Sequence, residues 1–450
     1  MNFKLSKYIH ILKDKELLPK SVILYGTRRG VVYELTNTQL DVLEKGDFAL
    51  LPFDIIKTLI QTCIIIPTEE NELQRILEEN KASTKDSNTL SFTIQPTANC
   101  QLGCHYCGQV HTKKTMSVNV ADLMIERIKQ KIINEKSKFK SLNIAWYGGE
   151  PLTGLSSIEY SSFILQDLAE KNNLEYSAQM VTNGLALKEK LFQHLVIDHK
   201  VKHFQITLDG TAKVHDNRRM LKNGSPSFDI IFNNICTIAL SDFYAQTGAR
   251  IAIRCNVSSE NRDNVFELMN LLKENNIHNK VIFSLARVTD WGDNEAGTKK
   301  KGGISKEEFA QLEIEVILKQ IAENFQLTPK NIIPQRRTNP CMVTNENTEV
   351  FDGFGNVSTC WEVPYTPYFN NEKFVAGNLV KNSNIDTSNV AMRKWFDEIP
   401  TNESWCKSCK FLPVCGGSCP KEWYQGIPAC PSFKFNIDER LLMKKFKIVD

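Results

Sequence analysis

Between residues 90 and about 290, short apolar runs alternate with longer stretches of helical periodicity. Helical patterns lie, for example, at Val120–Glu135 and Ser157–Asn172, and the apolar runs predicted as strands cover residues 90–95, 142–147, 176–181, 203–208, 250–257 and 280–286. Repeated alternation of strand and helix is typical of a parallel sheet with helices outside it. The central part of the chain is therefore predicted to have an α/β fold.

Polar and apolar positions alternate along two of these strands. In residues 204–209 one face is apolar, and the other carries Gln205, Thr207 and Asp209. In residues 250–257 the polar face carries Arg254 and Asn256. We expect the apolar faces to meet the helices and the polar faces to point inward, where an arginine is costly unless a carboxylate pairs with it.

The first 88 residues are predicted to form a separable unit. Two short strands, 21–25 and 31–35, flank a glycine-bounded turn and indicate a hairpin. Helices are expected from residue 36 or 37 to about 45, at 53–61 and at 71–79, with a short strand at 63–66. The polar stretch Lys81–Asn88 is expected to be a linker.

Thirteen cysteines in 450 residues add a chemical expectation to this pattern. The N-terminus has no secretory signal pattern, so metal or cluster binding is favoured over a disulfide framework. Ten cysteines fall in two spaced groups, and Cys63, Cys236 and Cys255 lie in apolar runs as ordinary buried residues. The net charge is +3, and residues of both signs are interspersed along the chain, so no nucleic-acid partner is expected. No apolar run reaches 18 residues, so we expect a cytoplasmic protein with no membrane partner.

The first cysteine group, Cys100, Cys104 and Cys107, has the spacing CxxxCxxC and follows the first predicted strand of the α/β region. Three thiolates on a short loop suit an iron–sulfur cluster and leave one iron of a cubane without a protein ligand. With Tyr106 before the last cysteine, the motif resembles that of the radical S-adenosylmethionine (SAM) enzymes. In that family the open iron binds SAM, which one electron splits to give a 5′-deoxyadenosyl radical. A zinc knuckle or a set of buried thiols is the alternative.

The resemblance implies a partial (β/α)6 barrel of the TIM type, whose working residues lie at the C-terminal ends of the strands. Residues 148–150, which follow the second strand, resemble the family's GGE motif, which holds the SAM amino group. Residues 182–184 match another recurrent SAM contact. The SAM-binding residues implied in this way are Tyr106, Gly148, Gly149, Glu150, Thr182, Asn183, Thr207, Asp209, Arg254 and Asn256.

Two points about this set stay open. Arg254 is expected to pair either with the SAM carboxylate or with Asp209. The stretch from Asp209 to Arg218 resembles the "LDG…HD.R" segment of the family branch that has auxiliary clusters. There, His215 and Asp216 either order a loop near the substrate or form local hydrogen bonds.

The second cysteine group resembles the family's SPASM domain. Carried over by position, the distal auxiliary 4Fe–4S cluster is held by Cys406, Cys409, Cys415 and Cys430, and the proximal one by Cys341, Cys360 and Cys419. A zinc ribbon is the alternative for residues 406–419. Residues 334–340 supply no eighth cysteine, so the proximal cluster is expected to have an open or non-cysteine fourth site.

Four domains are therefore expected. They are a winged-helix-like peptide-recognition domain at 1–88, a radical SAM partial barrel at 89–305, a helical connector at 306–334 and a cysteine-rich SPASM domain at 335–450. The order of elements in the first domain resembles the leader-binding element of peptide maturases, in which a leader peptide adds as a strand to the hairpin edge. A cap that only packs on the barrel is the alternative.

The resemblance implies an enzyme that abstracts a hydrogen from a ribosomally made precursor peptide and cross-links it oxidatively through a thioether, C–C or C–O bond. It would use SAM, three 4Fe–4S clusters and a reductant such as flavodoxin or ferredoxin. The alternatives are an anaerobic sulfatase-maturing enzyme that forms formylglycine and a non-catalytic scaffold that carries clusters. The sequence identifies no catalytic acid or base, and the candidates are Asp209, Glu346, Asp352 and Glu362.

Overall fold

A computed structural model describes residues 2–135, 138–290, 297–298, 301–327, 332–382, 384–398, 400, 405–446 and 448. The chain forms two compact units, each built from segments that are distant in sequence. One unit comprises residues 1–86, 328–345 and 394–450, and the other comprises residues 87–327 and 346–393. We call them the mixed unit and the barrel unit.

The barrel unit contains the six predicted strands, all of which are parallel to their neighbours. In spatial order they run from β11 to β6, and their bounds are β6 Thr89–Gln95, β7 Ser141–Trp146, β8 Glu175–Thr182, β9 Val201–Thr207, β10 Arg250–Val257 and β11 Ile282–Arg287. Each observed strand lies within two residues of its predicted bounds. The prediction of an α/β fold with a parallel sheet is confirmed.

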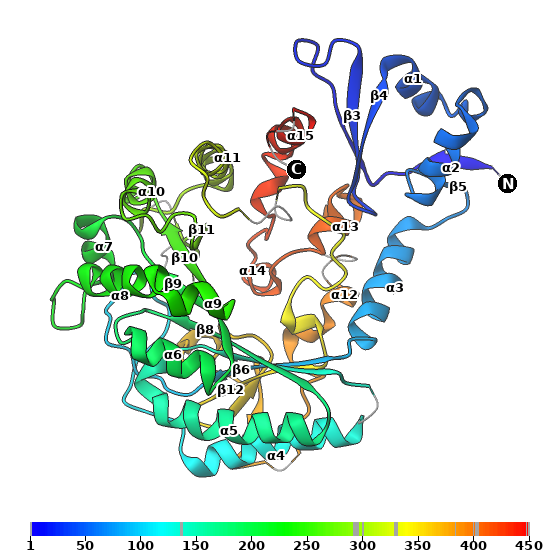
Figure 1. The fold of residues 1–450 in the computed structure, drawn as a ribbon. Coiled ribbons are helices and arrows are strands. Elements are labelled where there is room, and N and C mark those ends of the chain that lie inside the picture. The colour runs from blue at the N-terminus through cyan, green and yellow to red at the C-terminus, as the bar shows by residue number, and fades with distance from the viewer. Residues whose placement is uncertain are drawn as a thin grey trace. The chain divides into compact units, whose positions relative to one another are not determined.

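Helices connect these strands and cover the outer side of the sheet, as Figure 1 shows for α4, α5, α6 and α8. The helices of this unit are α4 Val118–Asn134, α5 Leu155–Lys171, α6 Glu189–Ile197, α7 Ala212–Arg219, α8 Phe228–Leu240, α9 Asp242–Thr247, α10 Asn264–Glu274 and α11 Lys306–Ala322. The apolar positions of the strands and the inner faces of the helices form one continuous core. Helix α11 occupies most of the predicted connector, whose residues 328–331 lie outside the described residues.

Three further strands extend this sheet beyond β6, which the sequence analysis did not predict. Strand β12 (Thr348–Asp352) pairs in parallel with β6, and the antiparallel strands β13 (Asn356–Ser358) and β14 (Val375–Asn378) follow it. Arg127 of α4 fixes this extension because it donates two hydrogen bonds, of 2.7 and 2.8 Å, to the fully buried Glu349 of β12. Residues 346–393 therefore fold with the barrel, although the sequence placed them in a C-terminal domain.

In the mixed unit, the N-terminal segment folds as the sequence indicated. The hairpin consists of β3 (Ser21–Gly26) and β4 (Val31–Thr36), and β2 (Ile9–Leu12) completes a three-stranded antiparallel sheet with β4 at one edge. A capping box at Thr36 begins the first helix, and the other elements of this segment are β1 Phe3–Leu5, α1 Asn37–Lys45, α2 Phe53–Gln61, β5 Ile65–Pro67 and α3 Glu72–Lys85. β1 pairs antiparallel with β5.

The predicted linker at 81–88 is wrong over most of its length, because α3 continues to Lys85. The helix persists through polar residues because Asn80 and Thr84 lie on its buried face. Arg336 donates a hydrogen bond of 2.6 Å to Asn80 Oδ1, which gives that buried amide a partner. A polar sequence therefore did not mark the end of the helix here.

The expectation that residues 1–88 are separable is also wrong. Leu12, Ile23 and Tyr25 pack in one core with Val414 and Leu441 of the C-terminal segment. A second cluster joins residues from both ends of the sequence, namely Tyr8, Ile76, Cys406 and Leu412. The C-terminal helices that take part in or flank these cores are α12 Trp395–Glu398, α13 Leu412–Cys415, α14 Pro420–Tyr424 and α15 Ile437–Lys445. The N-terminal sheet therefore depends on the cysteine-rich C-terminal segment for part of its core.

No helix in the described part of the chain is long and apolar enough to cross a membrane.

Candidate active site

A cavity of about 230 Å³ lies at the C-terminal ends of the parallel strands. The three cysteines of the CxxxCxxC motif line it together with residues that follow β7 and β8 and with residues near the ends of β9 and β10. The predicted SAM-binding residues that line it are Tyr106, Gly148, Gly149, Thr182, Asn183, Thr207, Arg254 and Asn256. The strand ends thus bring eight of the ten predicted residues to one cavity, and the other two, Glu150 and Asp209, lie behind its wall.

The cysteine loop is held by backbone hydrogen bonds to the segment that follows α7. Gly103 N donates to Met220 O at 2.9 Å, and Lys222 N donates to Gln101 O at 2.9 Å. The Nδ2 atom of Asn183 lies 3.8 Å from the Cys100 sulfur. The three thiols therefore line one cavity from a loop whose backbone is held by residues 220–222.

Gly148 and Gly149 allow the turn after β7 to approach the chain just before the cysteines. A Cβ at Gly149 would lie 2.4 Å from Asn99 O, and one at Gly148 would lie 2.2 Å from Gln95 Oε1. Gly148 also has a φ of +84°, which favours glycine. Both glycines are required by contact with the protein chain itself, in addition to any contact with a ligand.

Glu150 is fully buried and holds the end of β8 against the end of β7. One carboxylate oxygen accepts hydrogen bonds from Leu152 N at 3.0 Å and Thr182 Oγ1 at 2.7 Å, and the other accepts one from Asn183 N at 2.6 Å. Burial raises the pKa of Glu150, and these three donors oppose that rise. The carboxylate positions Thr182 and Asn183, which do line the cavity.

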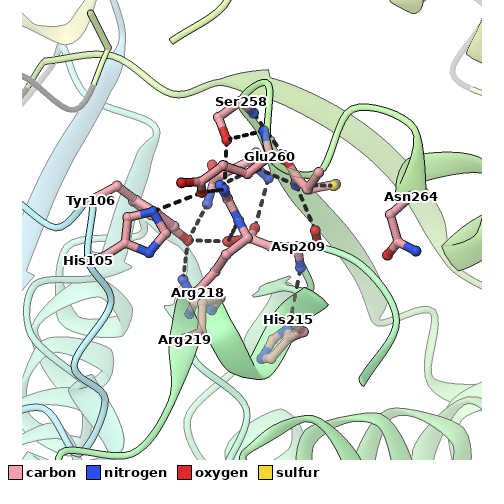
Figure 2. A network of polar contacts seen from close by, with 12 residues as sticks. His105, Tyr106, Asp209, His215, Arg218, Arg219, Ser258, Glu260 and Asn264 are labelled. Atoms are coloured by element: carbon pink, nitrogen blue, oxygen red, sulfur yellow. Dashed lines mark hydrogen bonds and ion pairs between the residues drawn. The ribbon is translucent and has the colours of Figure 1, made fainter. Parts of the chain in front are cut away.

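Tyr106 anchors the cysteine loop to the opposite strands through a buried polar network (Figure 2). Its hydroxyl donates to Asp209 Oδ2 at 2.6 Å and accepts from Arg219 Nη1 at 2.6 Å and Asn256 Nδ2 at 3.1 Å. Asp209 also accepts a hydrogen bond from Asn256 N at 2.9 Å. The network places a carboxylate and a guanidinium beside the cysteines in a water-poor setting, where both act strongly.

Arg218 extends this network away from the cavity. Its guanidinium lies 3.6 Å from Asp209 Oδ2 and donates hydrogen bonds of 2.7 Å to Ser258 Oγ and to Glu260 Oε2 (Figure 2). His105 lies 3.2 Å from the same Glu260 carboxylate. Asp209, which the sequence offered as a partner for Arg254, is thus paired with Arg218, and Arg254 Nε donates to Asn256 Oδ1 at 2.9 Å.

His215 and Asp216 form local hydrogen bonds, which was one of the two expected roles. His215 accepts from Asp209 N at 3.3 Å and contacts Ser227 Oγ at 3.1 Å. Asp216 Oδ1 accepts from Ser227 N and Phe228 N, the residues at the start of α8. Both side chains fix the loop between β9 and α8.

Arg219 is a site residue that the sequence analysis missed. It is buried, lines the cavity and lies close enough to Cys100, Cys104 and Cys107 to lower the pKa of each thiol. Burial acts in the opposite direction and dominates, since it raises the pKa of Cys100 to about 11 and that of Cys104 to about 12. No motif marks Arg219 in the sequence, because its burial and its place beside the cysteine loop come from the fold.

The four candidate acids and bases lie in different places. Glu362 lines the cavity, and Asp209 accepts a hydrogen bond from Tyr106, which lines it. Asp352 instead accepts hydrogen bonds from Phe354 N and Asn356 N and fixes the turn after β12. Glu346 is exposed, away from the residues that line the cavity. Gln205, which was predicted only to point inward, also lines the cavity, as do His111 and Trp361, which were not predicted.

A second group of cysteines lies in the mixed unit. Cys406, Cys409, Cys415 and Cys430 line one small cavity, together with Lys434, whose ammonium lies 3.5 Å from the Cys430 sulfur. Burial raises the pKa of Cys415 to about 12, and ionisation of the three neighbouring cysteines would raise it too. Four converging thiols in an apolar pocket match the donor set of an iron–sulfur cluster.

The other three cysteines of the predicted C-terminal group are divided between the two units. Cys341 and Cys419 belong to the mixed unit and interact electrostatically with each other, and Cys360 belongs to the barrel unit.

Residues 94–290 match the sequence profile of the Radical SAM superfamily. This segment begins within β6, contains the three cysteines and ends just after β11. Residues 94–290 are a radical SAM domain.

Two enzymes are similar in sequence to parts of the chain. The chain is 31% identical to the cysteine-type anaerobic sulfatase-maturating enzyme of Clostridium novyi over 33% of this chain and 40% of that protein. It is 24% identical to the radical SAM cyclopropyl synthase TigE of Paramaledivibacter caminithermalis over 56% of this chain and 61% of that protein. The chain therefore matches less than two thirds of the length of either enzyme.

Two solved structures share the fold. Native anSMEcpe with bound AdoMet aligns with a TM-score of 0.59 and 18% identity, over 80% of this chain and 100% of that chain. Streptococcus suis SuiB bound to the precursor peptide SuiA aligns with a TM-score of 0.53 and 16% identity, over 96% of this chain and 98% of that chain. With its maturase relatives, the radical SAM domain identifies the chain as an enzyme.

Proposed function

We propose that the chain is a radical SAM maturase that cross-links a ribosomally made precursor peptide by net two-electron oxidation. The main support is the extent of the likeness to SuiB, a protein solved with its precursor peptide, because it covers 96% of this chain. The anSMEcpe structure is matched over its whole length and leaves a fifth of this chain uncovered. The fifth of this chain that anSMEcpe leaves uncovered supports the proposal of a peptide maturase.

The cavity in the radical SAM domain fits SAM and a 4Fe–4S cluster by the chemistry of its donors. Cys100, Cys104 and Cys107 would hold the cluster, and the guanidinium of Arg254 would receive the SAM carboxylate. When bound, the cluster and SAM supply a 5′-deoxyadenosyl radical that abstracts hydrogen. Glu150 and Asp209, which lie behind the cavity wall, would orient residues that line it. Glu150 accepts hydrogen bonds from Thr182 and Asn183, and Asp209 accepts one from Tyr106.

Auxiliary clusters would accept the second electron of the oxidation. Cys406, Cys409, Cys415 and Cys430 are the proposed ligands of the distal cluster, supported by their convergence on one pocket. Cys341, Cys360 and Cys419 are proposed for the proximal cluster from sequence position, with an open or non-cysteine fourth site. A flavodoxin or ferredoxin would deliver the first electron.

Glu362 is the proposed acid or base for the substrate. Of the four candidates it is the carboxylate that lines the cavity, and it lies near Cys107 and the half-buried Tyr147. A carboxylate in that place can take the proton that a substrate amide, thiol or hydroxyl loses when the new bond forms.

The edge of β4 is the proposed leader-binding site. In the described residues β4 ends the three-stranded sheet, so one of its edges is open to pairing with an extended peptide. Val31 and Tyr33 pack on the core that supports α1 and α2, which leaves the backbone of β4 rigid enough to act as a template.

Co-expression with short precursor peptides, chosen from any short reading frames that adjoin this gene, tests the proposal. Mass spectrometry is expected to show a peptide that has lost two hydrogen atoms per cross-link and that fragments as a ring. The Cys104→Ala variant is expected to leave the peptide unchanged. A peptide that is unmodified, or that reacts with a hydrazide probe for aldehydes, contradicts cross-linking.

A second function is supported by the 31% identity to the Clostridium novyi sulfatase-maturating enzyme. Under this alternative the chain would oxidise a cysteine or serine of a sulfatase to formylglycine. An aldehyde formed on a synthetic sulfatase peptide, and no change in the neighbouring precursor, would favour it.

A further inference from the structure

We propose that Glu159, His194 and His199 form a binding site for one divalent transition-metal ion, with Zn²⁺ the best match. They lie in the barrel unit, on α5, on α6 and in the turn before β9. The Nε2 atoms of the two histidines are 3.2 Å apart, and His194 Nε2 is 3.0 Å from Glu159 Oε1. One ligand atom from each of the three residues lies within 4.8 Å of the other two. This site does not include any residue of the cysteine cavity.

The distances match those of a coordination tetrahedron. Zinc binds imidazole nitrogen and carboxylate oxygen at about 2.0–2.2 Å, which places neighbouring ligand atoms about 3.3 Å apart. The observed separations of 3.2 and 3.0 Å are close to that edge. The two imidazole rings are nearly perpendicular, at 86°, and they approach each other through their Nε2 atoms.

Hydrogen bonds alone do not give every nitrogen and oxygen atom of this cluster a partner. His194 faces a carboxylate with each ring nitrogen, Asp198 with Nδ1 and Glu159 with Nε2. The single hydrogen on Nε2 must then serve both Glu159 and the nitrogen of His199. His199 is buried, and its Nδ1 has no hydrogen-bond partner in the described structure. A cation between the three ligand atoms would receive all three lone pairs at once.

Asp198 supplies the outer contact that metal-binding histidines usually have. Its Oδ2 atom lies 2.8 Å from His194 Nδ1. A carboxylate on the second ring nitrogen fixes the tautomer that leaves Nε2 free for the metal and makes that nitrogen a stronger ligand. The four residues thus give two imidazoles, one carboxylate ligand and one carboxylate that orients a histidine.

This donor set favours particular metals. Two imidazoles and a carboxylate suit Zn²⁺, whereas the thiols elsewhere in the chain suit softer centres. The two helix ligands and the turn ligand come from three segments, so a bound ion would tie α5, α6 and the start of β9 together. The expected consequence is a more stable barrel unit.

Zinc titration of the tag-free, cluster-loaded protein tests this proposal. The protein is equilibrated anaerobically with chelator-buffered Zn²⁺, and zinc and iron per chain are measured by mass spectrometry. His194→Ala and Glu159→Gln are expected to weaken binding at this site at least about tenfold, and Asp198→Asn by roughly tenfold. His203→Ala, an exposed histidine on β9, is the matched control and is expected to bind zinc as the wild type does.

Two further readouts separate this site from the thiols. Zinc X-ray absorption of the bound ion is expected to show nitrogen and oxygen neighbours, with imidazole scattering that is lost in His194→Ala. The melting temperature is expected to rise with Zn²⁺ in the wild type and in His203→Ala but not in His194→Ala. Equal zinc affinity in the wild type and in His194→Ala, or sulfur-only coordination in the wild type, would overturn the proposal.

Discussion

The guanidinium of Arg219 donates a hydrogen bond of 2.6 Å to the hydroxyl of Tyr106. This contact ties a permanent positive charge to the loop that carries the three cysteines of the radical SAM domain. Because the charge is buried, it acts on the thiols with little screening by solvent. Its effect on the cysteine site can be measured directly.

Replacing Arg219 by Gln is expected to lower the reduction potential of the cluster bound by Cys100, Cys104 and Cys107. A nearby positive charge stabilises the more negative, reduced state, so its loss makes reduction harder. Potentiometric titration followed by electron paramagnetic resonance measures the shift. Arg219→Lys keeps the charge and is expected to lie between Gln and the wild type. An unchanged potential in Arg219→Gln would contradict this role.

Tyr106→Phe is expected to destabilise the barrel unit. The hydroxyl makes three hydrogen bonds, to Asp209, Arg219 and Asn256, and its loss leaves buried polar partners unsatisfied. The cost is about 1–3 kcal/mol, which thermal unfolding shows as a lower melting temperature. Tyr160→Phe, whose hydroxyl bonds to Asp122 at an exposed position, is the control and should change it little. Equal melting temperatures for both variants would count against the network.

Glu150→Gln is expected to weaken SAM binding although its side chain lies behind the cavity wall. The amide would place an NH₂ group against one of the three donors that now point at the carboxylate, and so displace Thr182 or Asn183. Isothermal titration with SAM under anaerobic conditions measures the loss. The exposed Glu170→Gln serves as the control. Wild-type affinity in Glu150→Gln would show that this carboxylate is dispensable.

Cys409→Ala is expected to remove one cluster and leave the radical SAM site intact. The wild type should hold about 12 irons per chain, and the variant about 8, because each cubane contains four. Iron analysis and Mössbauer spectroscopy provide the count. Cys236→Ala, on α8 and outside both cysteine groups, should keep the wild-type content. An unchanged iron content in Cys409→Ala would remove the distal cluster from the proposal.

Leu441→Ala is expected to loosen the N-terminal sheet as well as the C-terminal helix. Leu441 is fully buried in a core that also contains Leu12, Ile23 and Tyr25. The cavity left by the substitution is expected to lower the free energy of unfolding by about 2–5 kcal/mol and to weaken the packing of both segments. Hydrogen exchange is expected to rise in β2 and β3 of this variant. Leu17→Ala, at an exposed position, should leave exchange unchanged. Faster exchange confined to α15 would mean that the N-terminal segment folds independently.

The sequence was sufficient for the features that depend on local pattern. The six parallel strands follow from apolar runs, and the inward faces of β9 and β10 follow from alternation at Thr207, Arg254 and Asn256. Strand β12 was missed because its pairing with β6 joins residues more than 250 positions apart. The shared core of residues 1–86 and 394–450 was missed for the same reason, since no local pattern records which apolar faces meet.

The sequence predicted the residues of the candidate site that belong to a motif. It did not predict the residues that reach the site only through packing. Motifs led to the cysteines, the two glycines and Glu150. Arg219 needed the fold, because its charge is significant only once the turn after α7 lies against the cysteine loop. Likewise, Glu362 is distinguished from Glu346 and Asp352 only by the cavity that it lines.

Anaerobic incubation of the reconstituted, reduced protein with SAM shows whether Cys100, Cys104 and Cys107 support cleavage of SAM. We expect 5′-deoxyadenosine to form with the wild type, and none to form with Cys104→Ala, which removes one of the three thiols. A protein that binds zinc at these cysteines and releases no 5′-deoxyadenosine with any reductant would contradict this expectation.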